Sequence, residues 1–317
     1  MSIKKRPLVI LTGPTAVGKT ALSIALAKRI GGEIISADSM QVYRHMDIGS
    51  AKITKEEMDG VPHYLIDELE PSEEFHIVKF KEMAEAALQK IYEKGHIPIV
   101  VGGTGFYIQG LLFDIDFEDT NEDASFRNEM LHYAKEHGNH ALHEKLRLVD
   151  EKASLEIHEN NVKRVIRALE YYHLTGNQIS AHNESERAKA SPYQFCYFVL
   201  NDDRKTLYER IDRRVDEMFE KGLIEEVRHL KELGYQKSDV SMQGIGYKEL
   251  FDYLEQTVTL EDTVELIKKS TRHFAKRQIT WFKREKDVIW LDKSVYGYDE
   301  QQLLDEMIHR LKEKEIV

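Results

Sequence analysis

Cysteine is almost absent from this sequence, which has one, Cys196, among 317 residues. A single cysteine excludes an internal disulfide and a zinc site built from cysteines. Its apolar neighbours predict a buried thiol. No apolar run approaches the roughly 20 residues of a membrane span, and none follows the basic start at residues 1–6 as it would in a signal peptide. We therefore expect a cytoplasmic protein with no membrane contact.

Histidine clusters and an excess of positive charge are missing as well. The 14 histidines are scattered, without the H-E-x-x-H spacing of a zinc site. The formal net charge of −11 does not favour nucleic-acid binding, which depends on neutralising phosphates. However, basic residues gather at 163–167, 204–214 and 268–286, and acidic ones at 56–74 and 114–123. This uneven distribution leaves a nucleic-acid partner open.

The sequence does contain a glycine loop between a strand pattern and a helix pattern. An apolar run at 7–11 precedes it, and a helical run at 20–30 follows. Its residues have the spacing G-x-x-x-x-G-K-T: Gly13, Pro14, Thr15, Ala16, Val17, Gly18, Lys19 and Thr20. Such a loop turns backbone N–H groups toward an anion at a helix N-terminus. Lys19 supplies a cation for phosphate oxygens, and the Thr20 hydroxyl can bind Mg²⁺. The motif predicts polyphosphate binding but leaves the polyphosphate open.

Strand and helix patterns alternate along most of the chain. This predicts an α/β fold with a P-loop NTPase-like parallel sheet flanked by helices. The expected strands are at 7–11, 34–35, 62–66, 97–101, 195–200 and 287–291. The expected helices are at 20–30, 160–170, 204–221, 223–233 and 261–285, with another that has Ser72 as its N-cap and continues to about residue 91. From about residue 116 to about residue 190 the sequence has no strand pattern. We therefore expect a core domain of residues 1–115 and 191–317 and an all-helical insertion domain at 116–190.

Two polar residues follow predicted strands at the edge where the phosphate loop must lie. Asp38 follows the strand at 34–35, and Thr104 follows the strand at 97–101 within a glycine-rich turn. Ligands of open α/β sheets bind beyond the carboxyl ends of the strands, so both residues are candidates to face the ligand. The polar loop at 48–52 could return toward this edge. The glycines beside Thr104 are also explained by a tight turn alone.

Basic residues share helix faces at two places. Arg210 and Arg214 are four residues apart, a spacing suited to gripping one phosphate. On the helix at 160–170, Lys163, Arg164 and Arg167 lie near one face, and the apolar residues lie toward the interior. A solvated helix face is the simpler explanation of that second group.

Three kinds of protein are compatible with these parts. A small-molecule or nucleotide kinase would hold ATP in the loop and use Asp38 as its base, but it leaves the helical insertion and the basic helices without a role. A transferase with a diphosphate leaving group would hold that anion in the loop, and Asp38 would accept a proton from the attacking nucleophile. A non-catalytic RNA-binding ATPase is the third.

The order of motifs resembles the tRNA isopentenyltransferase family, in particular its bacterial tRNA dimethylallyltransferases. The matching segments are GPTAVGKT, ISADSMQVYR, DIGSAKIT, VGGTGFYI, NNVKRVIRALE, RIDRRVDEMFEKGLIEEV, MQGIGYKEL and AKRQITWFKRE. The resemblance runs from about residue 8 to about residue 292. It implies transfer of a dimethylallyl group from dimethylallyl diphosphate to N6 of adenine 37 in the tRNA anticodon stem-loop, with Mg²⁺ as the cofactor and an enzyme that we expect to be monomeric. The zinc finger of eukaryotic members is not expected here, because Cys196 is the only cysteine.

The resemblance also implies a role for each matched residue. The loop of residues 13–20 would hold the diphosphate rather than ATP, with Thr20 on Mg²⁺. Asp38 would be the general base, Thr104 would lie near the reaction centre and also contact tRNA, and Arg214 would steady the diphosphate.

The implied tRNA contacts lie in three segments. They are Asp38, Ser39, Met40 and Gln41 after the second strand, Arg127 in the insertion, and Lys163, Arg164, Val165, Ile166 and Arg167 on its strongest helix. Many members of the family have Gln where this chain has Lys163, and a lysine favours a phosphate contact.

Overall fold

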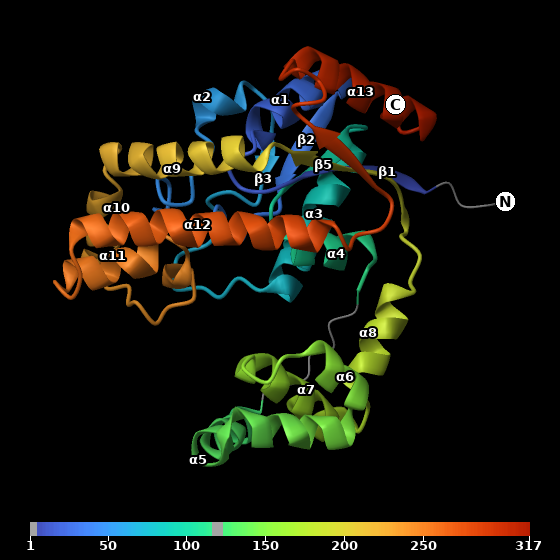
Figure 1. Cartoon of the computed structure of the whole chain (residues 1–317). Coiled ribbons are helices and arrows are strands. Elements are labelled where there is room, and N and C mark those ends of the chain that lie inside the picture. The colour runs from blue at the N-terminus through green and yellow to red at the C-terminus, as the bar shows by residue number, and fades with distance from the viewer. Residues whose placement is uncertain (1–4, 116–122) are drawn as a thin grey trace. The chain divides into compact units, whose positions relative to one another are not determined.

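The computed structural model describes residues 5–115 and 123–317, without the side chain of Arg187. The chain divides into two compact units, one made of Met1–Leu112 and Pro192–Val317 and the other of Phe113–Ser191 (Figure 1). The start of the insertion expected at Asp116 lies outside the described residues. None of the described helices is long and apolar enough to cross a membrane.

The first unit contains the parallel sheet that the sequence predicts. Its strands are β1 (Arg6–Thr12), β2 (Gly32–Ser36), β3 (His63–Tyr64), β4 (Ile97–Gly102), β5 (Tyr193–Asn201) and β6 (Val288–Asp292). They lie in the order β3-β2-β4-β1-β5-β6, and all neighbours run parallel. Thr12 of β1 is in register with Gly102 of β4 and Val199 of β5, so these strands end at one edge.

Helices cover both faces of this sheet (Figure 1). They are α1 (Lys19–Ile30), α2 (Lys55–Met58), α3 (Ile77–Glu93), α4 (Gly105–Leu112), α9 (Arg204–Glu220), α10 (Leu223–Glu232), α11 (Tyr247–Leu254), α12 (Leu260–Phe282) and α13 (Glu300–Glu313). α1 packs on β1, β2 and β4 and contacts α13. α3 packs on β2 and β4, and α12 contacts α4, α9 and α11. A core of buried side chains such as Leu11, Leu26 and Leu303 joins β1, α1 and α13.

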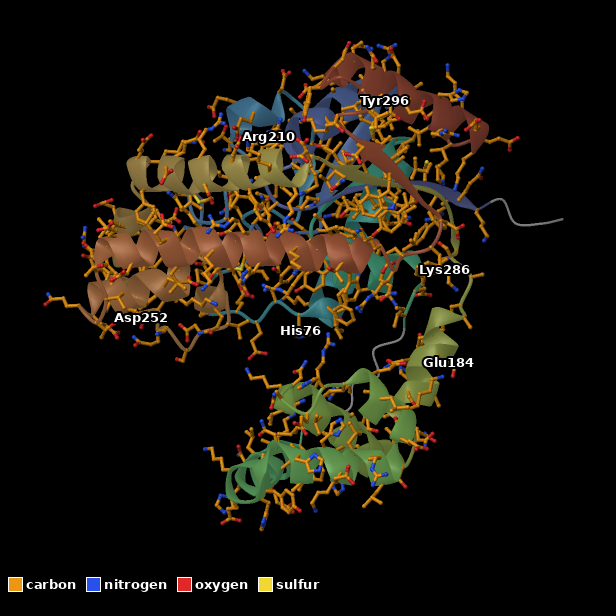
Figure 2. All side chains as sticks on the ribbon, in the orientation of Figure 1. His76, Glu184, Arg210, Asp252, Lys286 and Tyr296 are labelled. Atoms are coloured by element: carbon orange, nitrogen blue, oxygen red, sulfur yellow. The ribbon has the colours of Figure 1, made fainter. Side chains whose placement is uncertain are left out.

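One helix begins later than the sequence predicts. The expected N-cap, Ser72, is wrong, because α3 begins at Ile77 with His76 as its N-cap. The ring of His76 (Figure 2) accepts a hydrogen bond from the Lys79 N–H at 3.4 Å. Glu73, which would open the helix if Ser72 were its N-cap, instead accepts the Glu70 N–H at 2.8 Å and closes a separate turn.

In the second unit every helix or strand among the described residues is a helix, as predicted. It contains α5 (Ala124–Val149), α6 (Glu151–Glu156), α7 (Val162–Thr175) and α8 (Ile179–Arg187). Gly138, with φ 86°, interrupts α5. Asp150 joins two helices, since its carboxylate accepts the Ala153 N–H at the start of α6 and the Ser180 hydroxyl of α8. Buried side chains including Leu142, Leu146, Val165, Ile166 and Leu169 form a core of the unit's own.

Candidate active site

The predicted phosphate loop connects β1 to α1, and glycine is required at its first position. Gly13 has φ 148°, and a Cβ there would lie 2.3 Å from the carbonyl oxygen of Leu200, at the end of β5. Ala16 and Gly18 also have positive φ angles, 62° and 99°. Left-handed residues within a tight loop are the geometry that makes a backbone concavity for an anion. The loop therefore has the backbone that polyphosphate binding needs.

Lys19 begins α1 and folds back over the loop. Its Nζ donates to the carbonyl oxygens of Gly13 and Pro14, at 3.0 and 2.8 Å. Removal from water and the nearby Arg214 cation lower the pKa of Lys19 to about 7, and the Asp38 carboxylate offsets part of that. Among the described residues no carboxylate forms an ion pair with this ammonium. A bound anion would supply the missing negative charge.

Asp38 follows β2 in a turn that fixes its carboxylate. Oδ1 accepts the backbone N–H of Met40 at 2.8 Å and that of Gln41 at 3.4 Å. The Gln41 side chain donates to the carbonyl oxygen of Ala51 at 3.3 Å. The loop at 48–52 therefore does return to this turn, as the sequence suggested.

Arg214 of α9 completes the charged group around the phosphate loop. Burial lowers its pKa, and Asp38 raises it in part, so the fold brings Lys19, Asp38 and Arg214 within electrostatic range of one another. Arg210, one turn earlier on α9 (Figure 2), is engaged elsewhere, 3.0 Å from the buried carboxylate of Asp202. Arg210 therefore already has a partner within the fold, and its contact with the same phosphate as Arg214 stays a prediction.

Thr104 lies beside Asp38 because two strand ends approach closely. Its backbone N–H donates to the carbonyl oxygen of Ala37 at 3.2 Å. A Cβ on Gly102 would lie 2.2 Å from that same oxygen, so only glycine allows the approach. This packing explains Gly102 without a ligand, and it also delivers Thr104 to the edge of the sheet where the phosphate loop lies.

The predicted tRNA residues of α7 fall into three environments. Lys163 and Arg164 are exposed on α7. Val165 and Ile166 are 0% and 4% exposed and belong to the unit's core, so the tRNA contact predicted for them would have to use the backbone. Arg167 faces outward but is 3.0 Å from the Glu170 carboxylate.

Glu170 is a residue that the sequence reasoning missed. Its side chain is fully buried, and it binds Arg127 at 2.7 Å as well as Arg167. Hydrogen bonds from these guanidinium groups outweigh burial and lower the pKa of Glu170. The carboxylate also accepts the Asp123 N–H at 3.0 Å. The sequence feature that could have identified Glu170 is its place on the apolar face of α7, three residues after Arg167.

Gln278 of α12 is the second missed residue. It is 6% exposed, and its amide lies between the phosphate loop and the Thr104 turn. Oε1 accepts the Thr15 N–H at 2.9 Å, and Nε2 donates to the Gly103 carbonyl oxygen at 2.9 Å. The N–H of Thr15, expected to face the diphosphate, is thus already satisfied. Gln278 lies in the matched segment AKRQITWFKRE, but that segment does not identify Thr15 and Gly103 as its partners.

Met40, in the Asp38 turn, contacts the segment before α11. A Cβ on Gly244 would lie 2.5 Å from the Met40 methyl carbon. Gly49, in the loop at 48–52, likewise lies against Tyr247, whose hydroxyl donates to Glu226 of α10 at 2.8 Å. Helices α10 and α11 therefore support the turn that contains the candidate base.

Comparisons with known proteins agree with this geometry. A family model described as IPP transferase matches residues 41–285. A curated protein of Lachnoclostridium phytofermentans named tRNA dimethylallyltransferase is 62% identical, over 98% of this chain and 99% of that protein. One of Acetivibrio thermocellus with the same name is 49% identical, over 93% and 94%.

Solved structures give the same result. The tRNA isopentenylpyrophosphate transferase of Bacillus halodurans is 44% identical with a TM-score of 0.74, and the match covers 98% of each chain. A eukaryotic dimethylallyltransferase acting on tRNA is 32% identical with a TM-score of 0.76, over 90% of this chain and 74% of that one. The chain therefore belongs to the IPP transferase family.

Proposed function

We propose that this protein transfers a dimethylallyl group from dimethylallyl diphosphate to N6 of adenine 37 in tRNA. The observation that carries the proposal is the phosphate loop with Lys19 and Arg214, two cations without an ion-pair partner among the described residues, beside the carboxylate of Asp38. The two curated relatives are named for the transfer of a dimethylallyl group to tRNA.

The leaving group sets the main task of the site. An exocyclic adenine amine is a poor nucleophile, because its lone pair is delocalised into the ring. Breaking the bond from the allylic carbon to the diphosphate oxygen leaves a resonance-stabilised cation, and negative charge develops on the diphosphate. Loop N–H groups, Lys19 and Arg214 would stabilise that charge, and this interaction would lower the barrier.

Asp38 would orient the amine and accept its proton. Its Oδ1 is held by the Met40 N–H at 2.8 Å, so the carboxylate has a fixed direction without a neutralising ion pair among the described residues. Thr104 lies next to it through the Ala37 carbonyl. Adenine 37 must leave its stack to reach this point, at a cost of roughly a few kcal/mol.

Mg²⁺ is the divalent ion that we propose for the site. Thr20 is exposed in the first turn of α1. The described residues include no group of three or more His, Cys, Asp or Glu that could hold a metal. The Thr20 hydroxyl would hold the ion together with oxygens of the diphosphate. Such an ion would supply further neutralisation of the leaving group.

The tRNA would be held by exposed basic side chains that form no ion pair among the described residues. On α7 these are Lys163 and Arg164. On α12 and just after it they are Lys269, Lys276, Arg277, Lys283 and Arg284. They offset the net negative charge locally, so that phosphates can be bound. The protein would act as a monomer, in the cytoplasm where its tRNA substrate is found.

The test is to incubate the protein with Mg²⁺, dimethylallyl diphosphate and an anticodon stem-loop that has adenine at positions 36 to 38, and to measure the RNA mass. We expect a gain of one dimethylallyl group that is lost when adenine 37 is replaced. Hydrolysis of ATP or phosphoryl transfer, with no gain in RNA mass, would contradict the proposal and favour a kinase.

A further inference from the structure

The amide of Gln278 is held in one orientation by two opposite requirements. On one side the Thr15 N–H needs an acceptor, and on the other the Gly103 carbonyl oxygen needs a donor, each at 2.9 Å. Turning the amide over would place donor against donor and acceptor against acceptor. A glutamate lacks the donor, and a lysine lacks the acceptor. The site therefore needs a primary amide.

The turn that Gln278 reaches is shaped to receive α12. A Cβ on Gly103 would lie 2.1 Å from Gln278 Nε2, and a Cβ on Gly105 would lie 2.3 Å from the Trp281 ring. Gln278 and Trp281 are three residues apart and so share one face of the helix. Thr104 lies between the two glycines, and α12 therefore fixes this turn on both sides of it.

We propose that Gln278 is a positioning residue that sets the spacing between the diphosphate loop and the Thr104 turn. This inference rests on the proposed function. The loop would hold the leaving group, and the turn lies beside Asp38, which would hold the attacking amine. Gln278 connects them through Thr15 and Gly103, and would act on the reaction through these two residues. Misplacement of reacting groups by about 1 Å can cost about a hundredfold in rate, so a single amide at this point controls turnover.

The first test replaces the amide without changing the volume much. We expect Gln278→Met to lower kcat about tenfold or more, with the KM for the stem-loop changed less than about threefold, because the exposed basic residues are untouched. Gln89→Met on α3 is the matched control, since Gln89 is an exposed glutamine in a helix. A Gln278→Met variant with the kcat of the wild type would overturn the inference.

A pH profile separates positioning from loss of fold. In Gln278→Glu the ionised carboxylate still accepts from Thr15 but repels the Gly103 oxygen. Protonation restores a donor, so the ratio of variant to wild-type kcat should rise as the pH falls. The ratio for Gln278→Met should not depend on pH. Equal profiles for the two variants would contradict the role of the donor.

A double-variant cycle on thermal stability tests the contact whether or not the RNA is modified. Gly103→Ala should lower Tm in the wild-type protein, where the new methyl group meets Nε2. It should lower Tm far less in Gln278→Ala, where that atom is gone. Additive shifts would show that the residues do not meet. If the wild type fails to modify RNA while the Tm shifts of the two substitutions are non-additive, the proposed function is wrong but the contact between Gln278 and Gly103 is supported.

Discussion

In the second unit, the basic side chains of Arg127 and Arg167 have their acidic partner inside the fold. Glu170 is fully buried and binds both Arg127 and Arg167. Around the phosphate loop of the first unit, Lys19 and Arg214 form no ion pair with any described residue, and burial lowers the pKa of both. Charge that is neutralised within the fold serves stability. A partly buried charge without a partner costs stability, and we expect a ligand to supply the missing partner.

The same contrast separates two residues of one helix. Arg210 of α9 lies against the buried carboxylate of Asp202, and Arg214, one turn later, lies in the electrostatic range of Lys19 and Asp38. Helical spacing makes the two look equivalent, and their partners make them different. We therefore expect structural effects from one and functional effects from the other.

The largest effect is expected at the acid of the first unit. Asp38→Ala should lower turnover about 10² to 10⁴-fold, because the amine loses the group that accepts its proton. The affinity for tRNA should change little. Steady-state prenylation and RNA binding by filter retention would measure the two quantities. Near-normal turnover in this variant would remove Asp38 as the base.

The α9 pair gives a matched comparison. Arg214→Met should lower kcat about 10²-fold through lost stabilisation of the leaving group, with little loss of Tm. Arg210→Met should leave the buried Asp202 without its cation and lower the free energy of unfolding by about 3 kcal/mol, with diphosphate binding retained. Calorimetry would measure diphosphate binding by each variant, and thermal unfolding would measure its stability. A loss of stability in Arg214→Met and a loss of diphosphate binding in Arg210→Met would contradict this distinction between the two arginines.

In the second unit we expect a loss of stability and no loss of diphosphate binding. Glu170→Gln should lower the stability of this unit by about 2 kcal/mol, because two guanidinium groups lose a charged acceptor. Glu144→Gln is the control, since Glu144 pairs with Arg147 at the surface and such pairs contribute little. Limited proteolysis can follow the unit directly. Equal protease sensitivity of the two variants would argue against the buried triad.

Exposed cations of the second unit should act on tRNA instead. Replacing Lys163 and Arg164 by Met should weaken tRNA binding by about tenfold and reduce the slope of log affinity against log salt by about 1 to 2. The melting temperature should stay unchanged, because neither side chain has an ion-pair partner among the described residues. A salt slope equal to that of the wild type would assign this helix face to solvent.

The smallest effect should appear in the pH dependence of stability. The pKa of Lys19 is lowered from 10.5 to about 7, so between these values the unfolded chain binds a proton that the folded chain does not, and the contribution of Lys19 to stability increases with pH. Below pH 7 the buried ammonium is a cost. Lys19→Met should therefore stabilise the ligand-free protein at pH 6, and the gain should fade toward pH 10. Lys19→Arg, charged throughout, should show no such fading in chemical denaturation.

Much of the site could be predicted because its parts are local. The phosphate loop is eight consecutive residues with its own strand and helix, and the Asp38 turn is closed by hydrogen bonds to residues two and three positions later. Periodicity also placed Val165 and Ile166 in the interior, whereas the family motif assigned them to tRNA. Both side chains are buried, as the periodicity predicts. A motif match identifies a segment but not the direction of each side chain.

The sequence alone determined which backbone could hold a polyphosphate and which acid follows the neighbouring strand, because glycine spacing and strand ends are short-range properties. Only the tertiary structure decided which charges stay without a partner. The partner of Arg127 is 43 residues away, and the amide that meets Thr15 is 263 residues away. Spacing along the chain cannot encode such contacts, because they depend on how α7 and α12 pack within their own units.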